Sequence, residues 1–290
     1  MPRNPIIACE LLPQVKKTIE NYADELVRDA HTIGSHGLTQ QQFQESGIFR
    51  SALERLRGIQ AASMAEKRAF MEAILDYLQR KGKVRRWKFT GAGERHDYQI
   101  KMPDGRISIV ETKGCLDGNN TNIFERPPNA DEFVIWSLCQ NPGSDPRKNA
   151  WSGIHTRLGA EVIHRRQKVD GVVIWDMVCG TPGRPCPKLQ KDPARSIRLD
   201  RGVVPPPCIY LFPRSIPDPR SNPDPPCWSL TEVRLLQALH EAFKGDDEDV
   251  VQVHIEARMS GSDVERRTRF LRHATEFSCS SWSPLRRARA

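Results

Sequence analysis

Apolar side chains in the first part of the chain recur at intervals of three and four, the spacing of one face of an α-helix. The segment "FMEAILDYLQRKG" follows this spacing and ends at Gly82, a helix-stopping residue. The earlier segment "LLPQVKKTIENYADELVRDAHTIG" shows a similar pattern and ends at Gly34. The pattern therefore predicts an N-terminal helical region over residues 1–82.

From Lys83 onward the pattern shortens to the alternation that is typical of strands. "VRRWKF", "HDYQIK" and "ISIVETK" predict short strands, and "EFVIWSLC" and "VDGVVIWDMVC" predict two buried strands. Between these two lies "AWSGIHTRLGAEVIHRRQK", which predicts a helix. Residues 83–180 are therefore expected to form an α/β core, a mixed central sheet with an antiparallel hairpin and helices on its faces.

The remaining chain divides at the end of a proline-rich stretch. Residues 181–228 hold 13 of the 22 prolines, which predicts a loop-rich excursion without helix or central strand. In residues 229–290, "SLTEVRLLQALHEAF" begins with capping-box spacing and predicts a helix, and "VVQVHIEARM" predicts a strand. The same capping-box spacing at Ser262 and Glu265 predicts a final helix, followed by a basic tail.

The predicted hairpin brings two carboxylates together. Its loop "PDG" suits a type I turn followed by a left-handed glycine, which pairs Met102 with Arg106. Counting outward, Asp97 is expected opposite Glu111, and strand alternation places Lys113 on the same face as Glu111. A one-residue slip would undo this arrangement.

Two adjacent carboxylates on one face repel each other unless a cation lies between them. Mg²⁺ suits such a pair, and Lys113 beside it could orient a water molecule at a phosphodiester. A simpler interpretation also stands, because roughly one Glu-x-Lys tripeptide is expected by chance in a chain of this composition. In that interpretation Asp97 is a solvated strand end and Lys113 keeps an edge strand soluble.

This arrangement resembles the PD-(D/E)xK nuclease superfamily, most closely the type II restriction endonucleases. The matching residues are Asp97, Glu111 and Lys113, and His96 stands where the motif has its proline. The resemblance covers roughly residues 70–180, where the predicted elements follow the core order of that superfamily. It implies a restriction-endonuclease-like fold and Mg²⁺-dependent cleavage of double-stranded DNA at a specific sequence.

The resemblance implies further residues and partners. Asp97 and Glu111 would bind the metal with the carbonyl of Thr112, and Mn²⁺ could replace Mg²⁺. Glu72, in the preceding helix, could add a carboxylate, although a solvated helix face explains it equally well. A homodimer is expected for cutting both strands of a palindrome. A DNA methyltransferase would act on the same site without a stable complex.

Charge and polar loops suggest where DNA would bind. The chain has 44 Lys and Arg against 36 Asp and Glu, a net charge of +8 that suits a polyanionic partner. Candidate base and phosphate contacts fall in two polar segments, either of which could also be an ordinary solvated loop. They are Asn119, Asn120 and Asn122 in the first, and Gln140, Asn141, Arg147, Lys148, Asn149, His155 and Arg157 in the second.

The remaining sequence signals narrow the function. No signal-peptide core or apolar stretch of membrane-spanning length is present, so a reducing cytoplasm is expected, with the eight cysteines as thiols or metal ligands. Structural zinc could bind in the proline-rich excursion, although the cysteine spacings are unlike those of most zinc sites; the candidates are Cys179, Cys186, Cys208 and Cys227. No P-loop, dinucleotide-binding or serine-hydrolase motif occurs. The alternatives are a repair or structure-specific nuclease of the same fold and a non-catalytic DNA-binding module.

Overall fold

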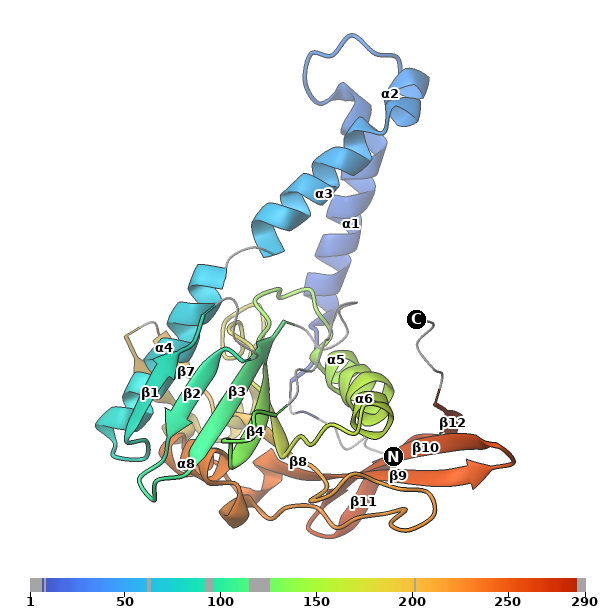
Figure 1. Ribbon diagram of the computed structural model, residues 1–290. Coiled ribbons are helices and arrows are strands. Elements are labelled where there is room, and N and C mark those ends of the chain that lie inside the picture. The colour runs from blue at the N-terminus through green and yellow to red at the C-terminus, as the bar shows by residue number, and fades with distance from the viewer. Residues whose placement is uncertain are drawn as a thin grey trace.

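The computed structural model describes residue 7 and residues 9–61, 64–91, 96–114, 126–200 and 202–285. It has an α/β body built on one mixed sheet, with a helical arm that projects from the body (Figure 1). Within these residues no helix is both long and apolar enough to cross a membrane. The general fold class expected from the sequence is therefore confirmed.

The helices fall into two groups, the arm and the body. The arm contains α1 (Pro13–Asp29), α2 (Gln40–Ser46) and α3 (Ile48–Ala61), with a 3₁₀ turn at Ala30–Thr32. The body contains α4 (Met64–Arg80), α5 (Pro146–Ser152), α6 (Gly159–His164), α7 (Pro187–Lys191) and α8 (Arg234–Ala242). A π-helical segment, Gly153–Leu158, joins α5 to α6. Shorter 3₁₀ turns span Pro193–Arg195, Leu230–Glu232 and Asp247–Asp249. Within the described residues, the region predicted to be helical, 1–82, contains α1, α2, α3 and α4.

Ten strands of the described chain form the central sheet, in the order β1-β2-β3-β4-β5-β8-β9-β10-β11 with β12 beside β10. The first three are antiparallel, β3, β4 and β5 are parallel, and β8 pairs antiparallel to β5 and parallel to β9. A separate pair is formed by β6 and β7. The bounds are β1 Arg86–Phe89, β2 Tyr98–Lys101, β3 Ile107–Lys113, β4 Glu132–Ser137, β5 Gly171–Ile174, β6 Ile197–Leu199, β7 Gly202–Val204, β8 Cys208–Leu211, β9 Val250–Ser260, β10 Asp263–Arg272, β11 Thr275–Cys279 and β12 Ser283–Pro284.

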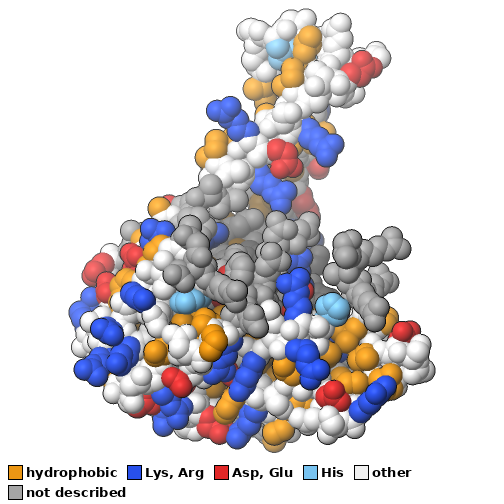
Figure 2. Space-filling view, in the orientation of Figure 1, with side chains coloured by type: hydrophobic (Ala, Val, Ile, Leu, Met, Phe, Trp, Pro, Cys, Tyr) orange, Lys and Arg blue, Asp and Glu red, His pale blue; other side chains and the backbone are white. Residues whose placement is uncertain are grey.

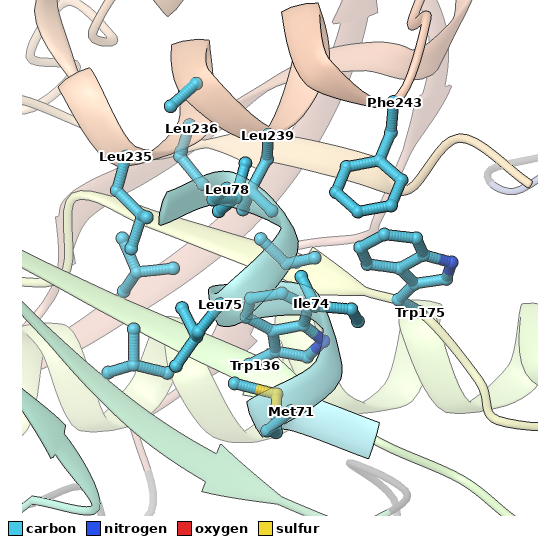
Figure 3. Packing of buried hydrophobic residues seen from close by; sticks show 14 of the residues in the cluster. Met71, Ile74, Leu75, Leu78, Trp136, Trp175, Leu235, Leu236, Leu239 and Phe243 are labelled. Atoms are coloured by element: carbon cyan, nitrogen blue, oxygen red, sulfur yellow. The ribbon is translucent and has the colours of Figure 1, made fainter. Parts of the chain in front are cut away.

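Apolar side chains cover both faces of the parallel strands, which makes the middle of the sheet rigid. On one face α4 and α8 pack their leucines against Trp136 of β4 and Trp175 after β5 (Figure 3). The two indoles stack with centroids 5.7 Å apart, and Phe243 meets Trp175 edge-on at 4.5 Å. On the other face α5, the π segment and α6 pack against Ile109 and Ile135. Continuous apolar runs such as "EFVIWS" are needed for a sheet covered on both sides.

The hairpin forms with the turn that its sequence predicts. The N–H of Met102 donates to the carbonyl of Arg106 at 2.8 Å, and Gly105 has φ of 93°, in the left-handed region. Lys101 lies opposite Ile107, as expected. The expected register is therefore confirmed from the turn as far as Tyr98.

The helix expected after Ser262 is wrong, because residues 263–272 form strand β10. It pairs with β9 through a tight turn that includes Gly261, whose φ is 62°. Burial alternates along β10, with Arg266, Thr268 and Phe270 buried, and this is the two-residue period of a strand. The capping-box spacing was therefore a coincidence. Residues 263–272 form a strand because they pair along their length with β9.

The prediction that residues 181–228 hold neither helix nor central strand is also wrong. The segment contributes β8, a central strand between β5 and β9, and the short helix α7. In both elements, proline does not interrupt the backbone hydrogen bonds. The "CIYL" of β8 follows the prolines at 205–207 and contains none, while Pro187 occupies the first turn of α7, where no N–H is required.

Candidate active site

A lysine and a glutamate form an ion pair at the end of β3. The Nζ of Lys113 donates to Oε1 of Glu111 at 2.6 Å, and strand alternation had placed both side chains on one face. The Glu111 side chain is 6% exposed and the Lys113 side chain 14%, so the pair is mostly removed from water. The apolar run before Glu111 fixes it in the sheet, between β2 and β4.

Burial dominates the electrostatics of Glu111. Burial, with a smaller contribution from the charge of Asp97, raises the pKa of this carboxyl to about 7. The hydrogen bond and the positive charge of Lys113 act in the opposite direction and keep the pKa from rising more. A carboxyl that titrates near neutral pH beside an ammonium group is typical of a functional site.

Asp97 lies close to this pair, but it does not stand opposite Glu111 as the extended register predicted. The N–H of Asp97 donates to the carbonyl of Val110 at 3.1 Å, although Val110 already pairs with Tyr98. Two residues of one strand therefore face one residue of the other, as in a β-bulge. The Oδ2 of Asp97 accepts from the N–H of Thr112 at 2.7 Å and from the Thr112 hydroxyl. Alternation along β3 puts Thr112 and Glu111 on opposite faces.

The helix α4 brings further charged side chains to the same end of the sheet. Glu72 is half-buried, and its charge, together with that of Asp97, raises the pKa of buried Tyr98 after the larger effect of burial. Arg68 acts on Tyr98 in the opposite direction. Lys67 places its Nζ about 4.0 Å from the position that a Cβ would take at Gly114, the residue after Lys113. The sequence indicated Glu72, whereas the two basic residues were missed because one helix turn does not reveal what it faces.

Within the described ranges, no group of three or more His, Cys, Asp and Glu side chains is arranged to hold a metal ion. Glu72 and Asp97 both act on Tyr98, and Asp97 also acts on Glu111, but Asp97 is bonded to Thr112 and Glu111 to Lys113. The chemistry of these groups still suits a hard divalent cation, because carboxylates and carbonyls are the oxygen ligands that Mg²⁺ prefers.

A buried arginine holds the polar loop that follows β4. Arg184 is 0% exposed and pairs with Asp176, just beyond β5. Its Nη2 donates to the carbonyls of Asn141 at 3.1 Å, Pro142 at 3.1 Å and Ser144 at 2.6 Å. The loop therefore has a fixed backbone although it carries few apolar residues. Arg184 lies in the proline-rich segment, so sequence distance hid this role.

The residues predicted to contact DNA differ from one another in exposure and in their partners. Asn119, Asn120 and Asn122 lie outside the described residues, as do the side chains of Lys148 and Asn149 in α5. Asn141 is exposed, Gln140 and Arg157 are half-buried, and Arg147 pairs with Glu10 at 2.6 Å.

The prediction that His155 contacts DNA is wrong. The residue is only 8% exposed and is packed inside the protein. It stacks on Trp151 with centroids 5.5 Å apart, and its Nδ1 lies 3.1 Å from the Thr268 hydroxyl. Burial, followed by the charge of Arg266, lowers its pKa to about 4. It is therefore a neutral packing residue in the sheet-facing helix, not a group presented to DNA.

The cysteines do not gather as the expected zinc set. Cys179, Cys186 and Cys208 line one cavity of about 20 Å³, but the fourth cysteine of that cavity is Cys9. Cys227 lies elsewhere, with its Sγ donating to the carbonyl of Val253 at 3.3 Å. In addition, Cys139 is disulfide-bonded, which contradicts the expectation of thiols throughout.

Comparison of the chain with protein-family models, with curated proteins and with solved structures found no match. The geometry at the end of β3 is therefore the basis for assigning a function.

Proposed function

We propose that this protein is a metal-dependent endonuclease of the PD-(D/E)xK type that cleaves double-stranded DNA at a specific sequence, as type II restriction enzymes do. The observation that carries the proposal is the buried ion pair of Glu111 and Lys113 at the open end of a hairpin, where the charge of Asp97 also raises the pKa of Glu111. On a solvated edge strand these groups would be exposed. Here they are buried, although burying charged groups costs free energy.

The ligands of the proposed cation are Asp97, Glu111 and the Thr112 carbonyl, with Glu72 of α4 as an additional carboxylate. Burial, and to a smaller extent the charge of Asp97, raises the pKa of Glu111, and a bound divalent cation would favour its ionised form. When bound, Mg²⁺ would neutralise charge on a phosphate and make a water molecule more acidic. Because Asp97 is bonded to Thr112, binding would require its carboxylate to reorient.

Lys113 is the proposed catalytic cation. Its ammonium group is held by Glu111 at 2.6 Å, so its position is set before any substrate arrives. Such preorganised charge stabilises negative charge that develops at phosphorus, and it can orient the attacking water. Lys67, close to Gly114, would add a second positive charge facing the phosphate backbone.

The loop fixed by Arg184 is the proposed reader of DNA sequence. Lys and Arg side chains are spread over the face of the body shown in Figure 2, which suits attraction to a polyanion. Asn141 is exposed on a backbone held by three hydrogen bonds, so its amide could reach a base edge at low entropic cost. Two copies would be needed to cut both strands of a palindrome.

The test is cleavage of unmethylated phage DNA by purified protein with Mg²⁺. We expect discrete fragments, which EDTA and the Lys113→Ala variant abolish. Lys101→Ala is the matched control, because Lys101 lies on the same hairpin beside the turn, at the opposite end from the ion pair. It should cleave like the wild type.

Other outcomes would change the assignment. A smear of products would favour a non-specific or repair nuclease of the same fold. DNA that is shifted on the gel but never cut, with Mg²⁺ or Mn²⁺, would contradict the enzyme proposal and favour a DNA-binding module. Cleavage by Lys113→Ala at the wild-type rate would move the active site away from β3.

A further inference from the structure

The helical arm, residues 13–61, exposes an unusual amount of apolar surface. Of the ten exposed large hydrophobic side chains in the described chain, eight lie between residues 19 and 59. On α1 they include Tyr22 at 64% and Val27 at 67%, and on α3 they include Leu56 at 55% and Ile59 at 60%. The body, which is much larger, contributes only Val203 and Met259 to this set.

The arm has little to stabilise it within one chain. Its tip has a small apolar cluster, where buried Phe43 stacks on His36 with centroids 5.0 Å apart. In contrast, α1 is a 17-residue helix with no buried residue at all. Isolated helices of this length are marginal in water, and most helical stability in proteins comes from packing of an apolar face. The exposed stripes on α1 and α3 therefore lack the packing that such a helix requires.

The two helices differ in charge, and the charges flank the apolar stripes. α1 carries four carboxylates against three basic residues, whereas α3 carries three arginines against one glutamate. Glu25 stands three residues after Tyr22, while Arg55 stands four residues before Ile59, so each is a neighbour of its stripe. The described ion pairs of these residues are local ones, such as Arg57 with Glu54. The net charges of −1 on α1 (four acidic minus three basic residues) and +2 on α3 (three basic minus one acidic) are of opposite sign, which suits their pairing across a two-fold axis.

We propose that the arms of two copies of this chain pack together, with α1 of each copy against α3 of the other, as a four-helix bundle. A two-fold axis makes each contact occur twice, so the apolar stripes are covered and the acidic and basic flanks are paired. Two arms of this length could bury an area on the scale of standard interfaces, about 1,600 Å² in total. α1 has no excess of positive charge, which a DNA-binding face requires, so a second copy is the occupant that we propose. The proposal does not depend on nuclease activity.

The test exchanges charges between the two helices and measures mass in solution by light scattering and sedimentation. One variant carries Glu25→Arg and Asp29→Arg on α1, and the other carries Arg55→Glu and Arg57→Glu on α3. We expect the wild type to be dimeric and each variant to bind itself at least about 100-fold more weakly, because like charges then meet. An equimolar mixture of the two variants should dimerise again, since both contacts in the mixed dimer are complementary.

Apolar substitutions test the stripes separately. Tyr22→Asp with Leu56→Asp should give a monomer, while Val203→Asp, an equally drastic change at an exposed position of the body, should leave the dimer intact. Circular dichroism would verify that every variant keeps a folded body. A wild type that stays monomeric up to about 100 μM, at concentrations where standard interfaces are saturated, overturns the proposal. Arm variants that remain dimeric, or a mixture that remains monomeric, also overturn it.

Discussion

Two buried ion pairs lie just at or beyond the ends of parallel strands, and they are built differently. Asp176 and Arg184 pair beyond β5, and the guanidinium also binds three loop carbonyls. Glu111 and Lys113 pair on β3, where the Lys113 side chain keeps 14% of its surface exposed, compared with 0% for Arg184. Burial raises the pKa of both carboxyls, to about 6 for Asp176 and about 7 for Glu111.

We propose that the Asp176–Arg184 pair is structural and that the Glu111–Lys113 pair is functional. Arg184 uses its charge to hold a backbone, and its partners could not change without moving the loop. At the end of β3, the charge of Asp97 adds to the effect of burial in raising the pKa of Glu111, while Lys113 opposes both. Active sites commonly retain such electrostatic conflict because the substrate or a cation resolves it.

The largest expected effect is on catalysis at the β3 pair. Glu111→Gln keeps the size of the side chain but removes its charge, so the proposed cation loses a ligand and Lys113 loses its anchor. We expect DNA cleavage to fall by at least about 10³-fold, the scale for removing one preorganised group. The free energy of unfolding in EDTA at pH 8 should stay equal or rise. A variant that cleaves normally would contradict the functional role of this pair.

The next largest effect is on stability at the other pair. Arg184→Met leaves Asp176 buried without its partner and frees the loop carbonyls, so we expect unfolding to become easier by about 3–5 kcal/mol. Urea denaturation would measure this loss. Arg86→Met, an exposed arginine on β1, is the control and should change stability by less than about 0.5 kcal/mol. If both variants behave alike, the Arg184 cluster does not support the fold as proposed.

The contrast between the pairs also shows what could be predicted from the sequence. The hairpin, its turn and the register near it followed from "MPDGR" and strand alternation, because these rules are local. The place of Asp97 did not, since one bulged residue redirects a side chain to the other face. The role of Arg184 was missed because the loop carbonyls that it binds are about 40 residues away, and β10 was misassigned because pairing with β9 overrode a capping signal.

The pH dependence of the unfolding free energy should show the contribution of Glu111 separately from that of Asp176. The folded pKa of Glu111, about 7, lies above its ordinary value of 4.5, so the folded state holds this proton more tightly. The stability that this group contributes is therefore complete below pH 4.5 and is lost as pH rises through 7. The difference in unfolding free energy between the wild type and Glu111→Gln should fall by up to about 3 kcal/mol over this range. Asp176 titrates in both proteins and cancels in the difference.

The stabilisation that Mg²⁺ provides should increase with pH, which is the opposite trend. A protonated carboxyl binds cations poorly, so the rise in melting temperature caused by Mg²⁺ should be larger at pH 8 than at pH 6. Differential scanning calorimetry with and without 10 mM MgCl₂ would measure it. A rise that is independent of pH, or that persists in Glu111→Gln, would place the cation elsewhere.

The smallest effect concerns the bond between Asp97 and Thr112. Thr112→Val keeps the shape of the side chain and the N–H that donates to Asp97, but it removes the hydroxyl donor. Losing one hydrogen bond to a charged group should cost about 1.5–3 kcal/mol of stability in EDTA. Thr275→Val, at an exposed position on β11, is the matched control. With Mg²⁺ present the loss should shrink, because the proposed cation draws Asp97 away from Thr112 and the hydroxyl then matters less. An equal loss in EDTA and in Mg²⁺ would mean that Asp97 keeps its bond to Thr112 and, like Asp176, belongs to the structural pairs.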